Sequence, residues 1–179
     1  RRLRFMTADG AADEYGRAEV LFVVVGTPRR DDGNVDLSQV FAVIEAAAPH
    51  LRDGGVVVVK STVPVGTTRE AASRLADLRP DLDFFPAANP EFMRQGSAVA
   101  DFEKPDRIVL GVSDPSAEGV LRRVFAPLID TGVATLVTTP ESAELIKYAA
   151  NAFLATKLSF INEIADLCEA SGAEVEEVT

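Results

Sequence analysis

The longest pattern in this chain lies near its end, between residues 141 and 168. Apolar or small side chains recur there at every third or fourth position, which is the period of one face of an α-helix. They are Leu145, Ala149, Phe153, Thr156, Phe160, Ile164 and Leu167. Thr139 can cap the start, Pro140 suits the first helical position and Gly172 can end the helix. At about 1.5 Å per residue this helix is roughly 40 Å long, enough to cross one domain and leave it.

Five shorter apolar runs before this helix predict strands, because they are rich in the β-branched residues that buried strands favour. They occupy residues 19–25, 56–60, 83–88, 107–112 and 134–138. Capping signals at Asp36, Thr67 and Asp114 predict helices over 36–48, 67–78 and 114–127. Residues 1–19 suggest a short strand, a cap at Thr7 or Asp9 and a short helix. Strands that alternate with helices predict an α/β fold, a parallel sheet with helices on both faces.

Composition narrows the class of protein. The chain has 179 residues, of which 47% are hydrophobic, enough for one domain with a core and the start of another. A net charge of −10 argues against a nucleic-acid surface. The longest apolar runs are far shorter than a membrane span, and residues 1–10 lack the apolar core of a secretion signal. The one cysteine, Cys168, allows no internal disulfide, so we expect a soluble protein of the reducing cytoplasm.

Three turns follow predicted strands, and they would meet at the edge where parallel strands end and ligands bind. They are GTP at 26–28, KSTVPVG at 60–66 and NPEF at 89–92. The hydroxyls of Thr27 and Thr62 suit ordinary turns as well as a ligand. Glu91 is either a solvated loop charge or a general base, and Arg94 can pair with a phosphate.

Lys147 and Asn151 stand one turn apart on the long helix, so their side chains point the same way. Taken alone, such a pair suits a solvated surface. In a cleft beside Lys147, Glu91 could activate water or take a proton. Neither His50 nor Cys168 has the neighbours of a catalytic or metal-binding residue, so we expect a surface histidine, a packed helical cysteine and no metal site.

Four segments together resemble the UDP-glucose/GDP-mannose dehydrogenase family, most closely the branch that acts on UDP-glucose. They are VGTPRRDDGNVDLSQV, VVVVKSTVPVGTT, AANPEFMRQGSAVADFEKPDRIVLGV and SAELIKYAANAFLATKLSFINEIADLCE. The resemblance implies the second part of a Rossmann-like, doubly wound parallel sheet in residues 1–139. Residues 140–179 would then be a long bridging α-helix and the start of a dimerisation domain. The parent protein would use NAD⁺ twice to oxidise C6 of a nucleotide sugar to the carboxylate, through an aldehyde and a cysteine-bound thioester, for polysaccharide biosynthesis.

The same resemblance implies roles for individual residues. Contacts to NAD are implied for Thr27, Thr62 and Gln95, although many family members have glutamate where this chain has Gln95. Catalytic roles are implied for Thr62, Glu91, Lys147 and Asn151. In these roles Thr62 helps to hold a water, Glu91 activates it, and Lys147 with Asn151 stabilises negative charge at C6. The residues that line the nucleotide sugar would be Glu91, Phe92, Met93, Arg94, Lys147 and Asn151. The long helix would also build a homodimer.

Two motifs of the family do not occur within these 179 residues. One is the Gly-rich G-x-G-x-x-G turn that binds the dinucleotide, and the other is the G-x-C-x-P-K-D segment that carries the nucleophilic cysteine. We therefore expect the chain to be a fragment that is inactive by itself. Two other hypotheses stay open. One is a parent that acts on GDP-mannose or a UDP-N-acetylhexosamine, and the other is a non-catalytic nucleotide-binding or dimerisation module.

Overall fold

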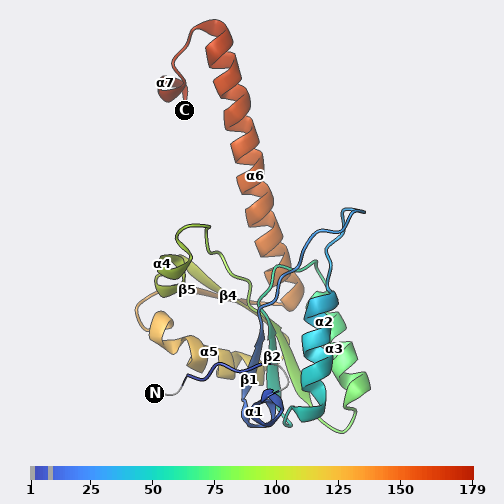
Figure 1. Cartoon of the computed structure of the whole chain (residues 1–179). Helices are drawn as coiled ribbons and strands as arrows, with labels where there is room; N and C mark the ends of the chain where they lie inside the picture. Colours follow the sequence, from blue (N-terminus) through green and yellow to red (C-terminus); the bar gives the residue numbers. More distant parts are fainter. Residues whose placement is uncertain (1–2, 8–9) are drawn as a thin grey trace.

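The computed structural model describes residues 3–7 and 10–179. A sheet of five strands lies at the centre, helices cover both of its faces, and the long helix α6 (Pro140–Ser171) runs away from it (Figure 1). A short helix, α7 (Val175–Val178), lies beside the far end of α6. The α/β class and the long final helix are therefore confirmed. Among the described residues, no helix is both long and apolar enough to cross a membrane.

The strands stand side by side in the order of the sequence. They are β1 (Val20–Val23), β2 (Gly55–Val59), β3 (Phe84–Ala88), β4 (Arg107–Val112) and β5 (Ala134–Thr138). All neighbours are parallel except β3 and β4, which are antiparallel, so the sheet departs from the expected parallel one at this junction. Between β3 and β4 the chain forms only the six-residue helix α4 (Ala98–Glu103), which is too short to cross back over the sheet.

This antiparallel junction brings the ends of several elements together. β3 and β4 pair only through Ala87 with Val112 and Ala88 with Gly111, near the last residues of both strands. Because β5 is parallel to β4, it also ends there, and α6 begins directly after it. Gly111 permits the approach of α6, since a Cβ at that position would lie 2.6 Å from the Cβ of Ala143. The first turns of α6 therefore pack at the end of β3.

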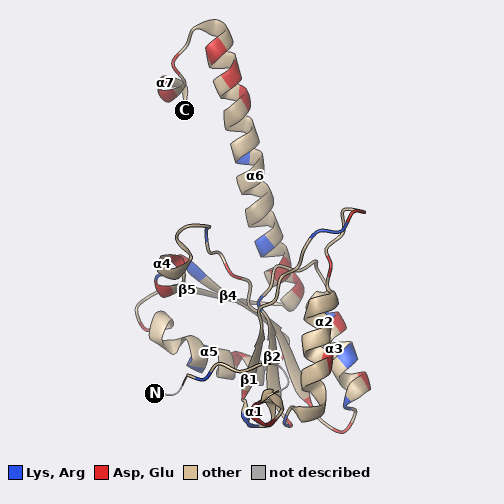
Figure 2. Ribbon diagram, in the orientation of Figure 1, with Lys and Arg blue, Asp and Glu red and all other residues tan. Residues whose placement is uncertain are grey.

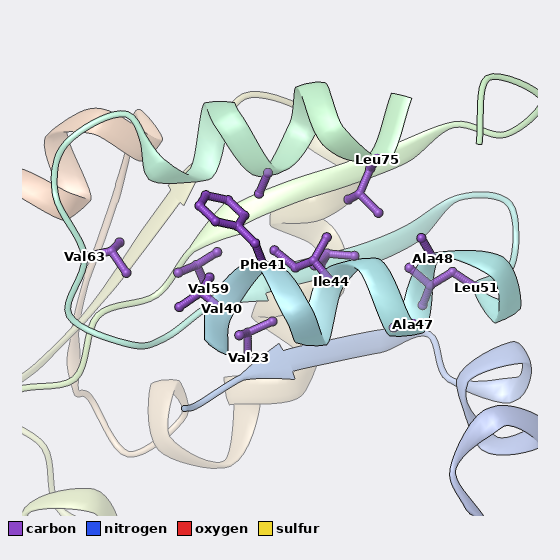
Figure 3. Close-up of a cluster of buried hydrophobic side chains, with 12 residues drawn as sticks. Val23, Val40, Phe41, Ile44, Ala47, Ala48, Leu51, Val59, Val63 and Leu75 are labelled. Atoms are coloured by element: carbon purple, nitrogen blue, oxygen red, sulfur yellow. The ribbon is translucent and has the colours of Figure 1, made fainter. Parts of the chain in front are cut away.

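Alternate side chains of the strands enter two cores, one on each face of the sheet. Val59 of β2 packs with Ile44 of α2 (Ser38–Ala47) and Leu75 of α3 (Thr67–Leu78), as Figure 3 shows. Val58 points to the other face, where it packs with Leu121 of α5 (Pro115–Ile129). Helix α1 (Ala12–Arg17) and the 3₁₀ turn η2 (Ala48–His50) contact each other. The sheet is thus a rigid platform for the loops at its edge.

Most predicted helix boundaries agree with the structure. Asp36, Asp114 and Thr139 each accept a hydrogen bond from a backbone N–H at the start of the helix that follows. Gly172 ends α6 in the left-handed conformation, with φ of 76°. At the N-terminal end, residues 3–7 do not form the predicted strand, and the predicted cap residue Asp9 lies outside the described residues.

Helix α3 is capped differently from the prediction. Its N-cap residue is Gly66, with φ of 95°, and the hydroxyl of Thr67 donates to the carbonyl of Pro64. The carboxylate of Glu144, in α6, accepts hydrogen bonds from the backbone N–H groups of Gly66 and Thr68. The cap therefore comes from a helix that is remote in the sequence, which no local pattern could reveal.

The apolar face predicted for α6 lies mostly in solvent in this structure. Phe153 is 72% exposed and Phe160 is 60% exposed. Only the first turns of the helix pack on the sheet, and there the buried side chains include Ala143, Glu144 and Lys147. The periodicity thus predicted the helix, while a different set of residues anchors it.

Candidate active site

Lys147 and Glu91 form an ion pair at the end of β3. The Nζ atom of Lys147 lies 3.0 Å from Oε1 of Glu91, and the Lys147 side chain is only 7% exposed. Lys147 belongs to the part of α6 that packs beside Gly111, and Glu91 belongs to the loop that follows β3. The interpretation of Lys147 as a solvated surface lysine is therefore wrong, and the two residues meet as the proposed chemistry requires.

Further contacts hold this ion pair in place. The backbone N–H of Met93 donates to Oε2 of Glu91 at 2.5 Å. Lys147 Nζ lies 5.4 Å from the centre of the Phe92 ring, and the guanidinium carbon of Arg107 lies 4.1 Å from the same centre. Because cations are attracted to the faces of aromatic rings, both positive groups help to fix the Phe92 ring. The loop after β3 is thus fixed to both α6 and β4.

Lys60 is a candidate that the sequence analysis did not single out. Its Nζ atom donates to Oδ1 of Asn89 at 3.0 Å, and Asn89, which is buried, donates to the carbonyl of Val109 at 2.8 Å. Burial lowers the pKa of Lys60 below its ordinary value; the charge of Glu91 opposes this change and that of Lys147 adds to it. A lysine directly after the apolar run VVVV was the available signal. Lys60 and Glu91 also line the same cavity, so a second ammonium group belongs to the surroundings of the ion pair.

The threonines predicted to bind NAD join the exits of β1 and β2. Thr27 Oγ1 donates to the carbonyl of Thr62 at 2.9 Å. Ser61 and Thr62 line one small cavity together with Glu144 and Lys147. Thr62 thus lies close to the ion pair, although it comes from a different strand exit.

The side chains of Arg94, Gln95 and Asn151 are exposed. The guanidinium of Arg94 lies 2.7 Å from a carboxylate oxygen of Asp101 in α4, so it is engaged within the protein. Hydrogen bonds from Arg94 hold the pKa of the Asp101 carboxyl well below its usual range. Gln95 lies in the turn before α4, and Asn151 lies one turn beyond Lys147 on α6.

A cavity of about 170 Å³ opens beside the ion pair. Its polar wall includes Lys60, Glu91, Arg94 and Arg107, and Phe125 of α5 contributes to its apolar part. Lysine and arginine side chains are well suited to bind phosphate and other anionic groups. The cavity therefore suits a ligand that combines negative charge with an apolar or ring-shaped part.

Cys168 and His50 are both remote from this cavity. Cys168 is buried near the far end of α6, where its carbonyl accepts a hydrogen bond from the N–H of Ala173. At about 1.5 Å per residue it lies roughly 30 Å along the helix from Lys147. His50 is exposed in η2. In the described part of the chain, no cluster of three or more His, Cys, Asp or Glu side chains could hold a metal ion.

Comparison with known proteins relates this arrangement to a family. Residues 1–129 match the UDP-glucose/GDP-mannose dehydrogenase family, NAD binding domain. Residues 141–179 match the central domain of the same family. The chain belongs to this family. The predicted division of the chain between residues 139 and 140 stays a prediction.

Individual relatives agree with the family. The UDP-glucose 6-dehydrogenase of Rhizobium meliloti (strain 1021) is 48% identical over 180 residues, which cover 99% of this chain and 41% of that protein. A UDP-glucose dehydrogenase structure from the archaeon Pyrobaculum islandicum has a TM-score of 0.87 and 41% identity, covering 94% of this chain and 40% of that one. A ternary complex of GDP-mannose dehydrogenase from Pseudomonas aeruginosa has the same TM-score, 30% identity and the same coverage. The chain thus spans about two fifths of the length of these relatives.

The ends of β1 and β2 have space and polar groups that fit part of an NAD molecule. A Cβ added at Gly26, just after β1, would meet no atom within 4 Å, so this turn is open. The half-buried side chains of Thr27 and Thr62 stand beside it. A hydroxyl that donates one hydrogen bond keeps two lone pairs, which can accept from an amide or ribose group. These two threonines therefore fit the cofactor contacts predicted for them.

Proposed function

We propose that this chain contributes part of the active site of an NAD-dependent dehydrogenase that oxidises C6 of UDP-glucose to the carboxylate. The observation that carries the proposal is the ion pair between buried Lys147 and Glu91 at the end of β3. Paired ionisable groups at the edge where α/β sheets bind ligands are typical of sites for charge stabilisation and proton transfer. The similarity to a UDP-glucose 6-dehydrogenase supports the choice of substrate.

Lys147 and Asn151 stabilise the negative charge that develops on the C6 oxygen. An ammonium group has three donors, so Lys147 can contact Glu91 and still donate to a substrate oxygen. Because Lys147 is buried, solvent screens its charge less than that of a surface lysine. Asn151 adds an amide donor from the next turn of α6. Donors fixed before the reaction stabilise a transition state without further reorganisation.

Glu91 is the base that activates water for hydrolysis of the thioester, and Thr62 helps to hold that water. Contacts with Lys147 and the N–H of Met93 fix both oxygens of the Glu91 carboxylate. A carboxylate has about four lone-pair sites, so acceptor positions remain for a water molecule. With its side chain 26% exposed, Glu91 is also accessible from outside the site.

The remaining predicted residues bind the two ligands. NAD⁺ supplies the hydride acceptor for both oxidations. Thr27 and Thr62 orient it from the ends of β1 and β2, and Gln95 orients it from the turn before α4. Phe92 and Met93 line the nucleotide sugar. Arg94 lines it as well and keeps the loop in place through its ion pair with Asp101.

The nucleophile is a cysteine other than Cys168, because Cys168 lies roughly 30 Å along α6 from Lys147. The C6 alcohol loses a hydride and a proton to give the aldehyde. The cysteine thiolate then adds to the carbonyl carbon, loss of a second hydride gives the thioester, and water releases the carboxylate and the thiol. Lys147, Asn151 and Glu91 serve these steps from this chain.

We also propose a homodimer formed through α6, and a cytoplasmic location. The middle of α6 carries exposed apolar side chains and few charges (Figure 2). They are Phe153, Leu154, Leu158 and Phe160. A contiguous apolar surface of this kind marks an interaction site. One buried cysteine suits a reducing compartment.

A second candidate substrate is GDP-mannose or a UDP-N-acetylhexosamine. The GDP-mannose dehydrogenase of Pseudomonas aeruginosa has the same TM-score as the UDP-glucose dehydrogenase of Pyrobaculum islandicum, so the backbone does not separate the two activities. The higher sequence identity to the UDP-glucose enzyme, 41% against 30%, favours UDP-glucose.

The test is NADH formation by the full-length protein from which this chain derives, with each nucleotide sugar in turn. We expect kcat/KM for UDP-glucose to exceed the value for the other two by about 10²-fold or more. If the protein prefers GDP-mannose or the N-acetylhexosamine, that nucleotide sugar is its substrate and UDP-glucose is not. Tight nucleotide binding without NADH from any of them would favour the non-catalytic module.

A further inference from the structure

Glu144 is a buried carboxylate that the proposed reaction does not use. It is 3% exposed, and its two oxygens accept three short hydrogen bonds. Gly66 N donates to Oε2 at 2.6 Å, and the N–H and hydroxyl of Thr68 each donate to Oε1 at 2.7 Å. All three donors belong to the first residues of α3 and the turn before it, whereas Glu144 belongs to α6.

These hydrogen bonds give α3 the cap that its own sequence does not provide. The first N–H groups of a helix have no hydrogen-bond partner within the helix. They also form the positive end of the helix dipole, which favours an anion. Burial of a carboxylate is costly unless donors compensate for it. Here the compensation comes from backbone and hydroxyl donors, so the carboxylate and the start of α3 each need the other.

Glu144 stands between two parts of the candidate active site. It precedes Lys147 by three positions on α6, so the two side chains lie on the same face of the helix. The turn that it binds is the continuation of the loop that carries Thr62. Ser61, Thr62, Glu144 and Lys147 line the same small cavity. A shift of Glu144 would therefore change the distance between Thr62 and Lys147.

A second contact between the same helices provides a comparison. Glu141, one turn before Glu144, forms an ion pair of 3.1 Å with Arg69 of α3. The Arg69 side chain is 74% exposed and that of Glu141 is 36% exposed, and such pairs contribute little because solvent screens them. The Arg69–Glu141 ion pair can therefore hold α6 near α3 only loosely. The three short, buried hydrogen bonds of Glu144 fix the position of α6 relative to the start of α3.

We propose that Glu144 is a positioning residue that fixes Lys147 of α6 relative to Thr62 of the β2–α3 loop. This inference rests on the proposed function, in which Lys147 stabilises charge at C6 and Thr62 contacts NAD and the water. Glu144 itself is not proposed to touch either ligand. It acts through the two segments that it joins.

The test compares Glu144→Gln with Glu141→Gln in the full-length protein. Glutamine keeps the size of the side chain but replaces one acceptor oxygen by an NH₂ group, which faces an N–H donor. We expect Glu144→Gln to lower kcat by about 10–10²-fold, because a misplacement of 1 Å can cost that much. We expect KM for the nucleotide sugar to change by less than about threefold, since its binding residues remain. Glu141→Gln leaves both constants at the wild-type values.

Amide hydrogen exchange at Gly66 and Thr68 provides the second readout. In Glu144→Gln these two amides exchange faster than in the wild type, and Thr68→Val, which removes only the hydroxyl donor, gives a smaller loss of kcat. Wild-type kcat or wild-type exchange in Glu144→Gln would overturn the inference. The inference would also be overturned if kcat of Glu144→Gln, calculated per folded molecule, equalled that of the wild type. If the wild type forms no NADH from any nucleotide sugar, the proposed function fails, and the exchange rates alone then decide whether Glu144 fixes the turn.

Discussion

Lys147 Nζ lies 3.0 Å from Glu91 Oε1, which joins the long helix α6 to the loop that follows β3. One member of this pair is buried and the other is partly open to solvent. The ammonium is therefore fixed and desolvated, while the carboxylate stays accessible to water. Charge stabilisation and activation of water need these two environments, and a single ion pair provides both.

Replacement of the two donors on α6 should affect turnover more than binding. We expect Lys147→Ala and Asn151→Ala each to lower kcat of the full-length protein by about 10²–10³-fold, with a smaller change of KM, because their hydrogen bonds form mainly in the transition state. Lys157→Ala, which removes an exposed lysine from the same helix, is the control and should leave kcat unchanged. Steady-state NADH formation measures all three variants. Wild-type kcat in both Lys147→Ala and Asn151→Ala would contradict the role of these residues in charge stabilisation.

Replacement of the base should separate the two halves of the reaction. In Glu91→Gln we expect hydrolysis of the thioester to slow by about 10²–10⁴-fold, because a general base contributes that much. The first hydride transfer should slow less, since Glu91 does not take part in it. Rapid-mixing NADH measurements with mass spectrometry should reveal a cysteine-linked sugar that accumulates.

Glu103→Gln changes an exposed glutamate of α4 and serves as the control for this experiment. It should neither slow turnover nor trap an intermediate. Turnover of Glu91→Gln at the wild-type rate would rule out the role of Glu91 as the base.

Cys168→Ser should leave the activity of the full-length protein almost unchanged. The Cys168 side chain is buried at the far end of α6 and does not reach the site. The stability cost should be about 1 kcal/mol, which is typical of a small buried substitution, and should lower the melting temperature by about 2–4 °C. Thermal unfolding and the NADH assay together measure this. Lost activity in a folded variant would show that Cys168 is the nucleophile after all.

The contact of Arg94 with Asp101 should make stability depend on pH in the acid range. Hydrogen bonds from Arg94 lower the pKa of Asp101 below its ordinary value of 3.8. A lowered folded-state pKa gives a stabilising contribution that is complete above the unfolded value and is lost as the pH falls through the folded one. The melting temperature of Asp101→Asn should therefore lie below that of the wild type at pH values well above 3.8, and the difference should shrink under stronger acid.

The control for this measurement is Asp77→Asn, which changes an exposed carboxylate on α3. It should not reproduce the acid-dependent difference. The electrostatic role of the Arg94–Asp101 pair would be contradicted if the difference in melting temperature between wild type and Asp101→Asn stayed constant from neutral to acid pH.

Local patterns predicted most elements, because the information for them lies within a few residues. Thr139 and Gly172 mark the ends of α6, and β4 and β5 occupy the ranges that their apolar runs indicated. The direction of β4 relative to β3 was not local information. It follows from the connection through α4, a helix of only six residues that was not predicted.

In the candidate active site, too, local patterns predicted some features and contacts between remote parts of the chain determine the others. The turns with Thr27, Thr62 and Glu91 were expected at the sheet edge, and the structure brings Thr62 and Glu91 close to Lys147. The burial of Lys147 depends on the approach of α6 to Gly111, a contact between remote parts of the chain. The cap provided by Glu144 has the same origin. Such contacts leave no periodic signal in the sequence, so only the fold reveals them.

In the proposed function, the Lys147–Glu91 site belongs to an enzyme that oxidises the same carbon twice. The most direct measurement is the amount of NADH formed per UDP-glucose consumed, with the full-length protein, excess NAD⁺ and limiting UDP-glucose. We expect two NADH for each UDP-glucose, with UDP-glucuronate as the product. One NADH with an aldehyde as the final product, or no NADH at all, would contradict it.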